Sequence, residues 1–308
     1  MALGPPFSTD LAIAGPLREP RQMLADQEYG GHLSIHDDET AEKLGFSAGP
    51  IEGPTHYSQF VPLVLDLWGQ DFLERGCLSF HYQNACTEGD RVRAFVACPK
   101  SDAERALRLW AEKSDGTPVL AGTATMGPDY PPSELDTRLT RLRPPGKLRI
   151  LEDLRVGMRG ESREEVTMDF DQHMGALYPF TLNQKLEVIT EPSPWYTRDE
   201  GGRSPWKRPI LPWEMVSVLA ESKHESTNFP VKGPAVGLFA DQEIKLINGP
   251  LFVGHPYLLE REIVALSESR RTESYWVRTT ILDGETEDRV GEILLNHATL
   301  KDSYAGYA

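Results

Sequence analysis

The most constraining feature of this chain is a plan that occurs twice: one amphipathic helix followed by short alternating segments. In the first half the helix falls within 35–68, where apolar side chains recur at helical spacing. Pro54 fits its first turn, Gly69 fits just past its end, and Pro62 inside the pattern predicts a kink. The resulting apolar stripe has to be covered, and a sheet is the expected cover.

Alternation of apolar and polar residues predicts strands after each helix. These are 77–86, 91–98, 106–113 and 118–126 in the first half, and 242–247, 257–267, 274–282 and 291–300 in the second. Turn residues at 88–90 and 114–116 suit antiparallel hairpins. The second central helix is expected over 210–222, with an opening strand over 154–165. A short helix is expected over 38–44.

Short matching sequences support the repeat, since GPIEGPTHYS in the first half corresponds to RPILPWEMVS in the second. A long helix wrapped by a curled antiparallel sheet, present twice, makes an α+β fold. Its two sheets can join edge to edge and hide their exposed edges. We therefore predict two modules, 1–127 and 149–308, joined by the proline- and arginine-rich linker 128–148.

Composition argues against several classes of function. The net charge of −15 disfavours nucleic acid and anionic membranes, and no apolar run is long enough to span a bilayer. The N-terminus does not resemble a signal peptide, so we expect a soluble cytoplasmic protein. The three cysteines suit no disulfide framework, and nucleotide fingerprints and metal-ligand spacings are lacking, so no cofactor and no metal are expected. His173, His224, His255 and His297 are scattered and are expected to be structural or exposed.

The repeated plan and the loops before each helix resemble the MaoC-like (R)-specific enoyl-CoA hydratase and dehydratase family, over nearly the whole chain. In that family an Asp and a His, in the pattern Asp-x-Asn-Pro-x-His, activate water against an enoyl thioester. A backbone N–H at the helix start holds the thioester oxygen. The resemblance implies a double hotdog fold, in which two helix-and-sheet modules lie in tandem.

In the first half the family's catalytic pair is not retained. In the family an aromatic residue follows this pattern, and Phe46 is taken as that residue here. When positions are counted back from Phe46 without a gap, the His position falls on Ile35 and the Asp position on Gly30. The helix-start donor falls on Pro54, which has no N–H. Neither residue at the catalytic positions can move a proton.

Nearby ionisable residues could act in a different register. Glu52 and His56 flank the start of the central helix, where hotdog pockets open and the helix dipole favours an anion, so both are candidate catalytic residues. His36 is a candidate substrate contact, although His36 and Asp37 also suit a surface loop that caps the short helix. A structural role for each of these residues stays open.

The second half keeps competent groups at the family positions. In EPSPWY, Glu191 stands at the Asp position and Tyr196 at the His position, and the helix-start N–H falls on Trp213. We assign Glu191 as the base, Tyr196 as the acid or orienting group, and the Trp213 N–H as the oxyanion donor. A carboxylate near buried tryptophans can have its pKa raised toward neutrality. Alternatively, prolines brace this loop and Tyr196 fills a gap.

Substrate contacts are expected around the same loop. Trp195, Trp206 and Trp213 favour a flat or hydrophobic ligand, although they are also ordinary core residues. Glu214 matches His56 at the other helix start, so the two could line one pocket shared by the halves.

Basic residues of this loop could bind phosphate. Arg203 and Lys207 suit the phosphates of coenzyme A or of a carrier-protein arm, although interleaved acidic residues also suit a solvated loop. These features predict a cofactor-independent lyase that adds or eliminates water next to a carbonyl. The substrate would be an acyl-CoA thioester or a hydrophobic, even aromatic, small molecule. Another acid–base lyase or isomerase, a non-catalytic binding or partner subunit, and a thioesterase are the alternatives, and pairing into a homodimer stays open.

Overall fold

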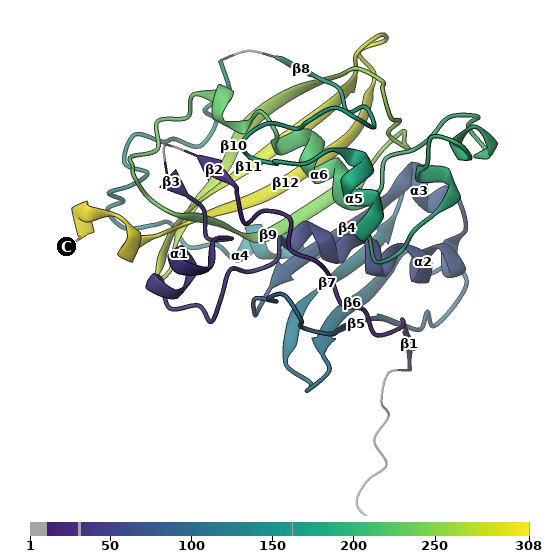
Figure 1. Ribbon diagram of the computed structural model, residues 1–308, viewed down its shortest axis with the longest axis horizontal. Helices are drawn as coiled ribbons and strands as arrows, with labels where there is room; N and C mark the ends of the chain where they lie inside the picture. Colours follow the sequence, from purple (N-terminus) through teal and green to yellow (C-terminus); the bar gives the residue numbers. More distant parts are fainter. Residues whose placement is uncertain (1–10, 30–31, 162, 308) are drawn as a thin grey trace, which may run out of the picture.

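A ten-stranded antiparallel sheet forms the centre of the computed structural model, which describes residues 11–29, 32–161 and 163–307 (Figure 1). Its order is β1-β5-β6-β7-β4-β9-β12-β11-β10-β8. The strands are β1 Ala12–Ala14, β4 Gly76–Tyr82, β5 Val92–Ala97, β6 Ala106–Lys113, β7 Pro118–Met126, β8 Glu164–Val166, β9 Gly237–Leu246, β10 Tyr257–Glu268, β11 Thr272–Asp283 and β12 Arg289–Leu300. A separate pair consists of β2 Glu28–Tyr29 and β3 His32–Leu33.

The strand order consists of two copies of one module joined at their edges. The series β5-β6-β7-β4 from the first half meets β9-β12-β11-β10 from the second, so each strand has a counterpart at the mirrored position. β4 and β9 pair antiparallel, from Cys77 opposite Lys245 to His81 opposite Asp241. This pairing satisfies the edge that each sheet would otherwise expose. The predicted α+β architecture with two joined sheets is confirmed.

Two long helices cover one face of this sheet. The helices are α1 Asp38–Lys43, α2 Tyr57–Trp68, α3 Asp71–Arg75, α4 Glu134–Arg141, α5 Leu182–Val188 and α6 Trp213–Glu221, and the short 3-10 turn η1 Gly53–His56 leads into α2. Figure 1 shows α2 and α6 in front of the sheet, and the two helices contact each other. Tyr57 and Phe60 of α2 are fully buried, with ring centroids 4.7 and 4.9 Å from Phe80 of β4. None of the helices in the described ranges is both long and apolar enough to cross a bilayer.

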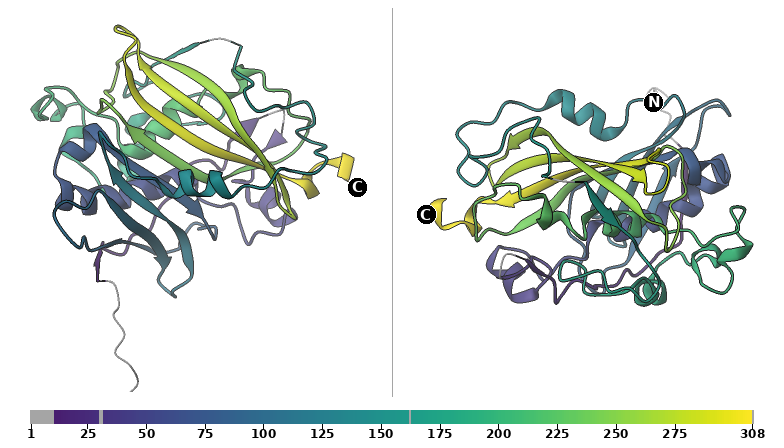
Figure 2. Two further views of the ribbon diagram at one scale, coloured as in Figure 1. Left: turned by 180° about the vertical axis from the view of Figure 1, so that it is seen from behind. Right: turned by 90° about the horizontal axis from the view of Figure 1, so that it is seen from above.

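The segment predicted as the linker, 128–148, contains the helix α4, which was not predicted from the sequence. α4 begins with a capping box, because Ser133 Oγ accepts from the Asp136 N–H and the Asp136 carboxylate accepts from the Ser133 N–H. Leu135 is fully buried against Trp276 and Leu294 of the second module. α4 lies on the sheet face opposite α2 and α6 (Figure 2). The connection between the halves is therefore packed onto the sheet.

Two local predictions were wrong. The strand expected over 154–165 is only the three-residue β8, because the chain before it turns and buries Leu151 and Leu154 under the second sheet. The turn at 88–90 joins β4 to β5, but these strands do not pair; β5 pairs with β1 and β6. By contrast, the turn at 114–116 connects the paired strands β6 and β7.

Because β4 and β7 pack closely at Gly122, adding one methyl group there should lower the stability of the protein. A Cβ at Gly122 of β7 would lie 1.8 Å from the Ser79 carbonyl oxygen of β4. We expect Gly122→Ala to lower the free energy of unfolding by about 1–3 kcal/mol, measured by urea denaturation. The matched control is Gly202→Ala, where an added Cβ meets no atom within 4 Å. Equal stability of the two variants would contradict this packing.

Candidate active site

A cavity of about 760 Å³ lies between the two halves. Its lining combines the loop before α2 and the segment after β4 with the start of β9 and parts of α6, β11 and β12. Three predicted site residues, His36, Glu52 and His56, are among the lining residues. All three come from the first half, near the start of α2, where the sequence reading expected a pocket to open.

His36 presents a defined imidazole to this cavity. Its Nδ1 lies 2.5 Å from the Pro50 carbonyl oxygen. Because a carbonyl only accepts, Nδ1 carries the proton and Nε2 keeps a lone pair. Burial lowers the pKa of His36 below its usual value, so the ring is neutral near pH 7.

The neighbouring Asp37 has the surface role that the sequence suggested for both residues. Its Oδ1 accepts from the Thr40 N–H at 2.8 Å and caps α1. Of these two neighbours, His36 is the one that lines the cavity, and it lies one residue after the position reached by counting back from Phe46. Gly30, the counted Asp position, lies outside the described residues.

Glu52 directly precedes η1 and His56 is its last residue; both are buried, with 4% and 2% of their surface exposed. Glu52 Oε1 accepts from Lys185 Nζ at 2.8 Å, and its Oε2 has no hydrogen-bond partner among the described residues. Burial lowers the pKa of His56 to about 4, so this ring is also neutral. Within the described part of the chain its Nδ1 likewise finds no partner.

A buried ammonium group joins the starts of the two central helices. Lys185 of α5 is 1% exposed, and its Nζ lies 2.8 Å from Glu52 and 3.2 Å from Glu214. Ser58 Oγ of α2 donates to Glu214 Oε2 at 2.6 Å. Burial disfavours the charge on Lys185, but Glu214 and Glu52 outweigh it and raise its pKa. Lys185 therefore links Glu52 and Glu214 near the two helix starts. The sharing of one pocket by Glu214 and His56 stays a prediction, because Glu214 is not among the residues that line the cavity.

The candidate pair of the second half lies apart from the cavity lining. Arg18 donates to both oxygens of Glu191, at 2.6 and 2.9 Å. Tyr196 is 6% exposed, and burial raises its pKa further above the usual range. Neither residue is among those that line the cavity. Their assignment as base and acid stays a prediction.

The other second-half candidates are also absent from the cavity lining. Trp213 is 2% exposed and stacks on Phe72 at 5.1 Å, which is a core position. Trp195 and Trp206 pack edge to face at 5.9 Å. Trp206 Nε1 donates to Glu74 at 2.9 Å.

The basic candidates of this loop are exposed. Arg203 lies 3.5 Å from Glu200, and Lys207 has a backbone φ of 60°. Both side chains belong to a solvated surface, as the alternative interpretation of this loop expected. Their role in phosphate binding stays a prediction.

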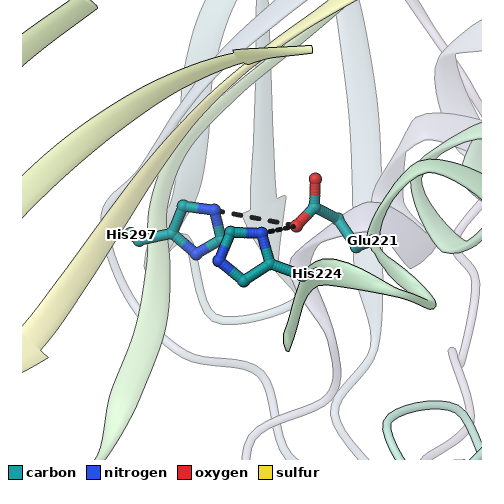
Figure 3. A group of neighbouring side chains, drawn as sticks. All are labelled: Glu221, His224 and His297. Carbon is teal, nitrogen blue, oxygen red and sulfur yellow. Dashed lines mark ion pairs between the residues drawn. The ribbon is translucent and has the colours of Figure 1, made fainter. Parts of the chain in front are cut away.

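A second polar cluster lines the same cavity and was not found from the sequence. Glu221 at the end of α6, His224 three residues later and His297 of β12 converge there (Figure 3). Glu221 Oε2 lies 3.3 Å from His224 Nδ1 and 3.6 Å from His297 Nε2. Burial raises the pKa of Glu221 to about 7 and lowers that of His224 to about 3. The Glu-x-x-His spacing of Glu221 and His224 could have indicated from the sequence that these two side chains are neighbours. His297 comes from a distant strand, and only the fold brings it next to them.

The buried carboxylates predict a large effect of removing Lys185. Lys185→Met would leave Glu52 and Glu214 buried without a counter-charge. We expect the free energy of unfolding to fall by about 3–5 kcal/mol, measured by chemical denaturation. The control is Lys43→Met, which removes an exposed ion pair with Glu39 and should leave stability unchanged. An equally small effect at Lys185 would refute this role for the ammonium group.

Solved structures with the same overall architecture cover nearly the whole chain. A protein from Chloroflexus aurantiacus J-10-fl, described as a MaoC-domain dehydratase, is 14% identical with a TM-score of 0.55; the match covers 96% of this chain and 95% of that one. A conserved hypothetical protein of Mycobacterium tuberculosis with a double hotdog fold is 12% identical with a TM-score of 0.58, covering 96% and 97%. A MaoC-like dehydratase is 12% identical with a TM-score of 0.50, covering 93% and 97%.

Sequence comparison adds no closer relationship. No family model matches the chain, and no curated protein matches it. At such low identities the structural likeness establishes the fold alone. The chain therefore has the double hotdog fold shared with solved MaoC-like dehydratases, as its internal repeat and loop sequences predicted.

Proposed function

We propose that this protein is a lyase of the hydratase or dehydratase kind, and that His36 moves the proton. The observation that carries the proposal is the orientation of His36: the Pro50 carbonyl fixes the proton on Nδ1 and leaves the Nε2 lone pair on a cavity-lining ring. A neutral imidazole with a free lone pair is suited to general base catalysis. Solved dehydratases with the same fold support the reaction class.

The proposed reaction adds water across a carbon–carbon double bond conjugated to a carbonyl. His36 Nε2 takes a proton from water, the water oxygen bonds to the β-carbon, and the double-bond electrons move toward the carbonyl oxygen. The protonated imidazole then gives its proton to the α-carbon. The negative charge of Glu52 favours the protonated ring and so stabilises this intermediate state. Dehydration is the same sequence in reverse.

A backbone donor at the start of η1 suits the developing oxyanion. Gly53 lines the cavity at the first position of the turn that runs into α2. The first N–H groups of a helix have no partner within the helix and can donate to a ligand. Glycine is required here, because a Cβ would lie 2.5 Å from the Tyr82 ring. We assign this role to Gly53, whereas counting along the family pattern had placed it at Pro54.

The cavity suits a ligand with an apolar chain. Its apolar lining residues include Leu24, Ile35, Phe46, Ile51, Val119 and Leu177. Arg271 lines the cavity and is exposed to solvent, so it can meet a phosphate group outside. An acyl-CoA thioester combines both features, and we propose this substrate class.

Substitution of His36 tests the proposal. His36→Gln can still donate to the Pro50 carbonyl but cannot take a proton, so we expect kcat to fall about 10²–10⁴-fold. Hydration of crotonyl-CoA or a longer enoyl-CoA is followed by loss of the absorbance of the conjugated thioester. The matched control is His173→Ala, at an exposed histidine that does not line the cavity, and it should retain full activity.

The same assay separates the alternatives. Full activity of His36→Gln, together with loss of activity in Glu191→Gln, would move the chemistry to the second-half loop. Release of free thiol without hydration would identify a thioesterase. Retention of the acyl-CoA without turnover would identify a binding protein.

The lowered pKa of His36 also predicts the pH profile. The base must be neutral, so kcat/KM should be constant near pH 7 and fall only as pH drops through the His36 pKa, below the usual value of about 6.5. The measurement is kcat/KM between pH 4 and 8, with buffers of constant ionic strength. An acid limb at or above pH 6.5 would contradict the assignment.

A further inference from the structure

We propose that Glu221, His224 and His297 bind one divalent transition-metal cation, such as zinc, on the wall of the cavity. The site is distinct from the proton-transfer residues proposed above and does not depend on them. Two imidazoles and one carboxylate form a donor set that proteins commonly use for such ions.

The spacing of the donor atoms suits one shared cation. Glu221 Oε2 lies 3.3 Å from His224 Nδ1 and 3.6 Å from His297 Nε2, and one donor atom from each residue lies within 4.8 Å of the others. Ligands about 2.0–2.1 Å from a tetrahedral ion are separated by roughly 3.3 Å. The three side chains thus approach the required arrangement without any large movement (Figure 3).

The same atoms lack other partners. Both oxygens of Glu221, His224 Nδ1 and His297 Nε2 are buried and have no hydrogen-bond partner among the described residues. Glu221 is only 2% exposed. Buried polar atoms are nearly always satisfied, so four convergent polar atoms without a protein partner are typical of a ligand-binding site.

Surrounding residues hold the imidazoles in position. His224 Nε2 lies 3.2 Å from the Tyr275 hydroxyl, which leaves Nδ1 facing Glu221. The His297 ring stacks on Tyr275 at 4.7 Å and on His224 at 4.3 Å. Such outer contacts fix the tautomer and orientation of metal-binding histidines.

The local charge is compatible with a dication. The charge of Arg261 acts on all three side chains, but its guanidinium pairs with the Glu164 carboxylate and donates to the Ala220 carbonyl. Glu221 is therefore the carboxylate left to balance a bound ion. Three protein ligands leave a coordination position for water or for an oxygen atom of a ligand in the cavity.

Metal binding tests the proposal without any activity assay. The full chain, stripped with a chelator and titrated with Co²⁺, should develop ligand-field absorption bands that saturate at one ion per chain. Elemental analysis after loading with Zn²⁺ should give the same stoichiometry. Glu221→Gln and His297→Ala should abolish stoichiometric binding, and Tyr275→Phe should weaken it about 10-fold. The control His173→Ala should bind as the original chain does.

Two results would overturn the proposal. One is a chain that binds no stoichiometric Co²⁺ or Zn²⁺. In that case Glu221 and the two histidines interact only with one another, through shared protons. The other is unchanged binding by Glu221→Gln and His297→Ala. If these variants fail to fold, X-ray absorption at the zinc edge of the original chain decides the question. A zinc ion held by these residues has two imidazoles among its ligands, and a spectrum without imidazole ligands contradicts the proposal.

Discussion

The antiparallel pairing of β4 with β9 is the interaction on which the rest of the structure depends. It joins two five-stranded halves into one sheet and places α2 and α6 on the same face, in contact with each other. Because the helices meet, their starts share the buried ammonium of Lys185. The cavity lies beside this contact and takes its lining from both halves. A single module would provide neither the ion cluster nor the cavity.

Local patterns in the sequence were sufficient to predict most of the fold. The strands expected over 106–113 and 118–126 have the bounds of β6 and β7, since alternation and turn residues define both ends. α4 was missed because prolines and arginines dominate its segment and its capping box uses Asp136 instead of Glu or Gln. The strand predicted over 154–165 was too long, because apolar residues before β8 are buried in irregular chain and not in a strand.

The candidate site was predictable only where it lies close together in the sequence. Glu52 and His56 lie at one helix start, so the first-half pattern placed them near a pocket, and His36 was a candidate substrate contact of the same half. Lys185 lies more than a hundred residues from Glu52, and no periodicity relates them. Likewise, Glu221 and His297 come from different elements, and only the register of β12 in the sheet brings them together. Pairs of residues so distant in the sequence can be recognised only once the fold is known.

Two polar groups of different chemistry therefore occupy one apolar cavity. His36 and Glu52 belong to the first half, and the cluster of Glu221, His224 and His297 belongs to the second. Tyr178 also lines the cavity; burial raises its pKa, and the charges of Glu221 and Glu52 add to this effect, so the tyrosine is within electrostatic reach of both groups. We propose that one side of the cavity serves proton transfer and the other cation binding.

The most direct test of the proton-transfer site is a crystal structure of the His36→Gln variant with an unreacted enoyl-CoA. If His36 is the base, the acyl chain lies in the cavity, with its β-carbon next to residue 36 and its thioester oxygen accepting from the Gly53 N–H. An acyl chain bound against Glu191 and Tyr196, outside this cavity, would contradict this role of His36.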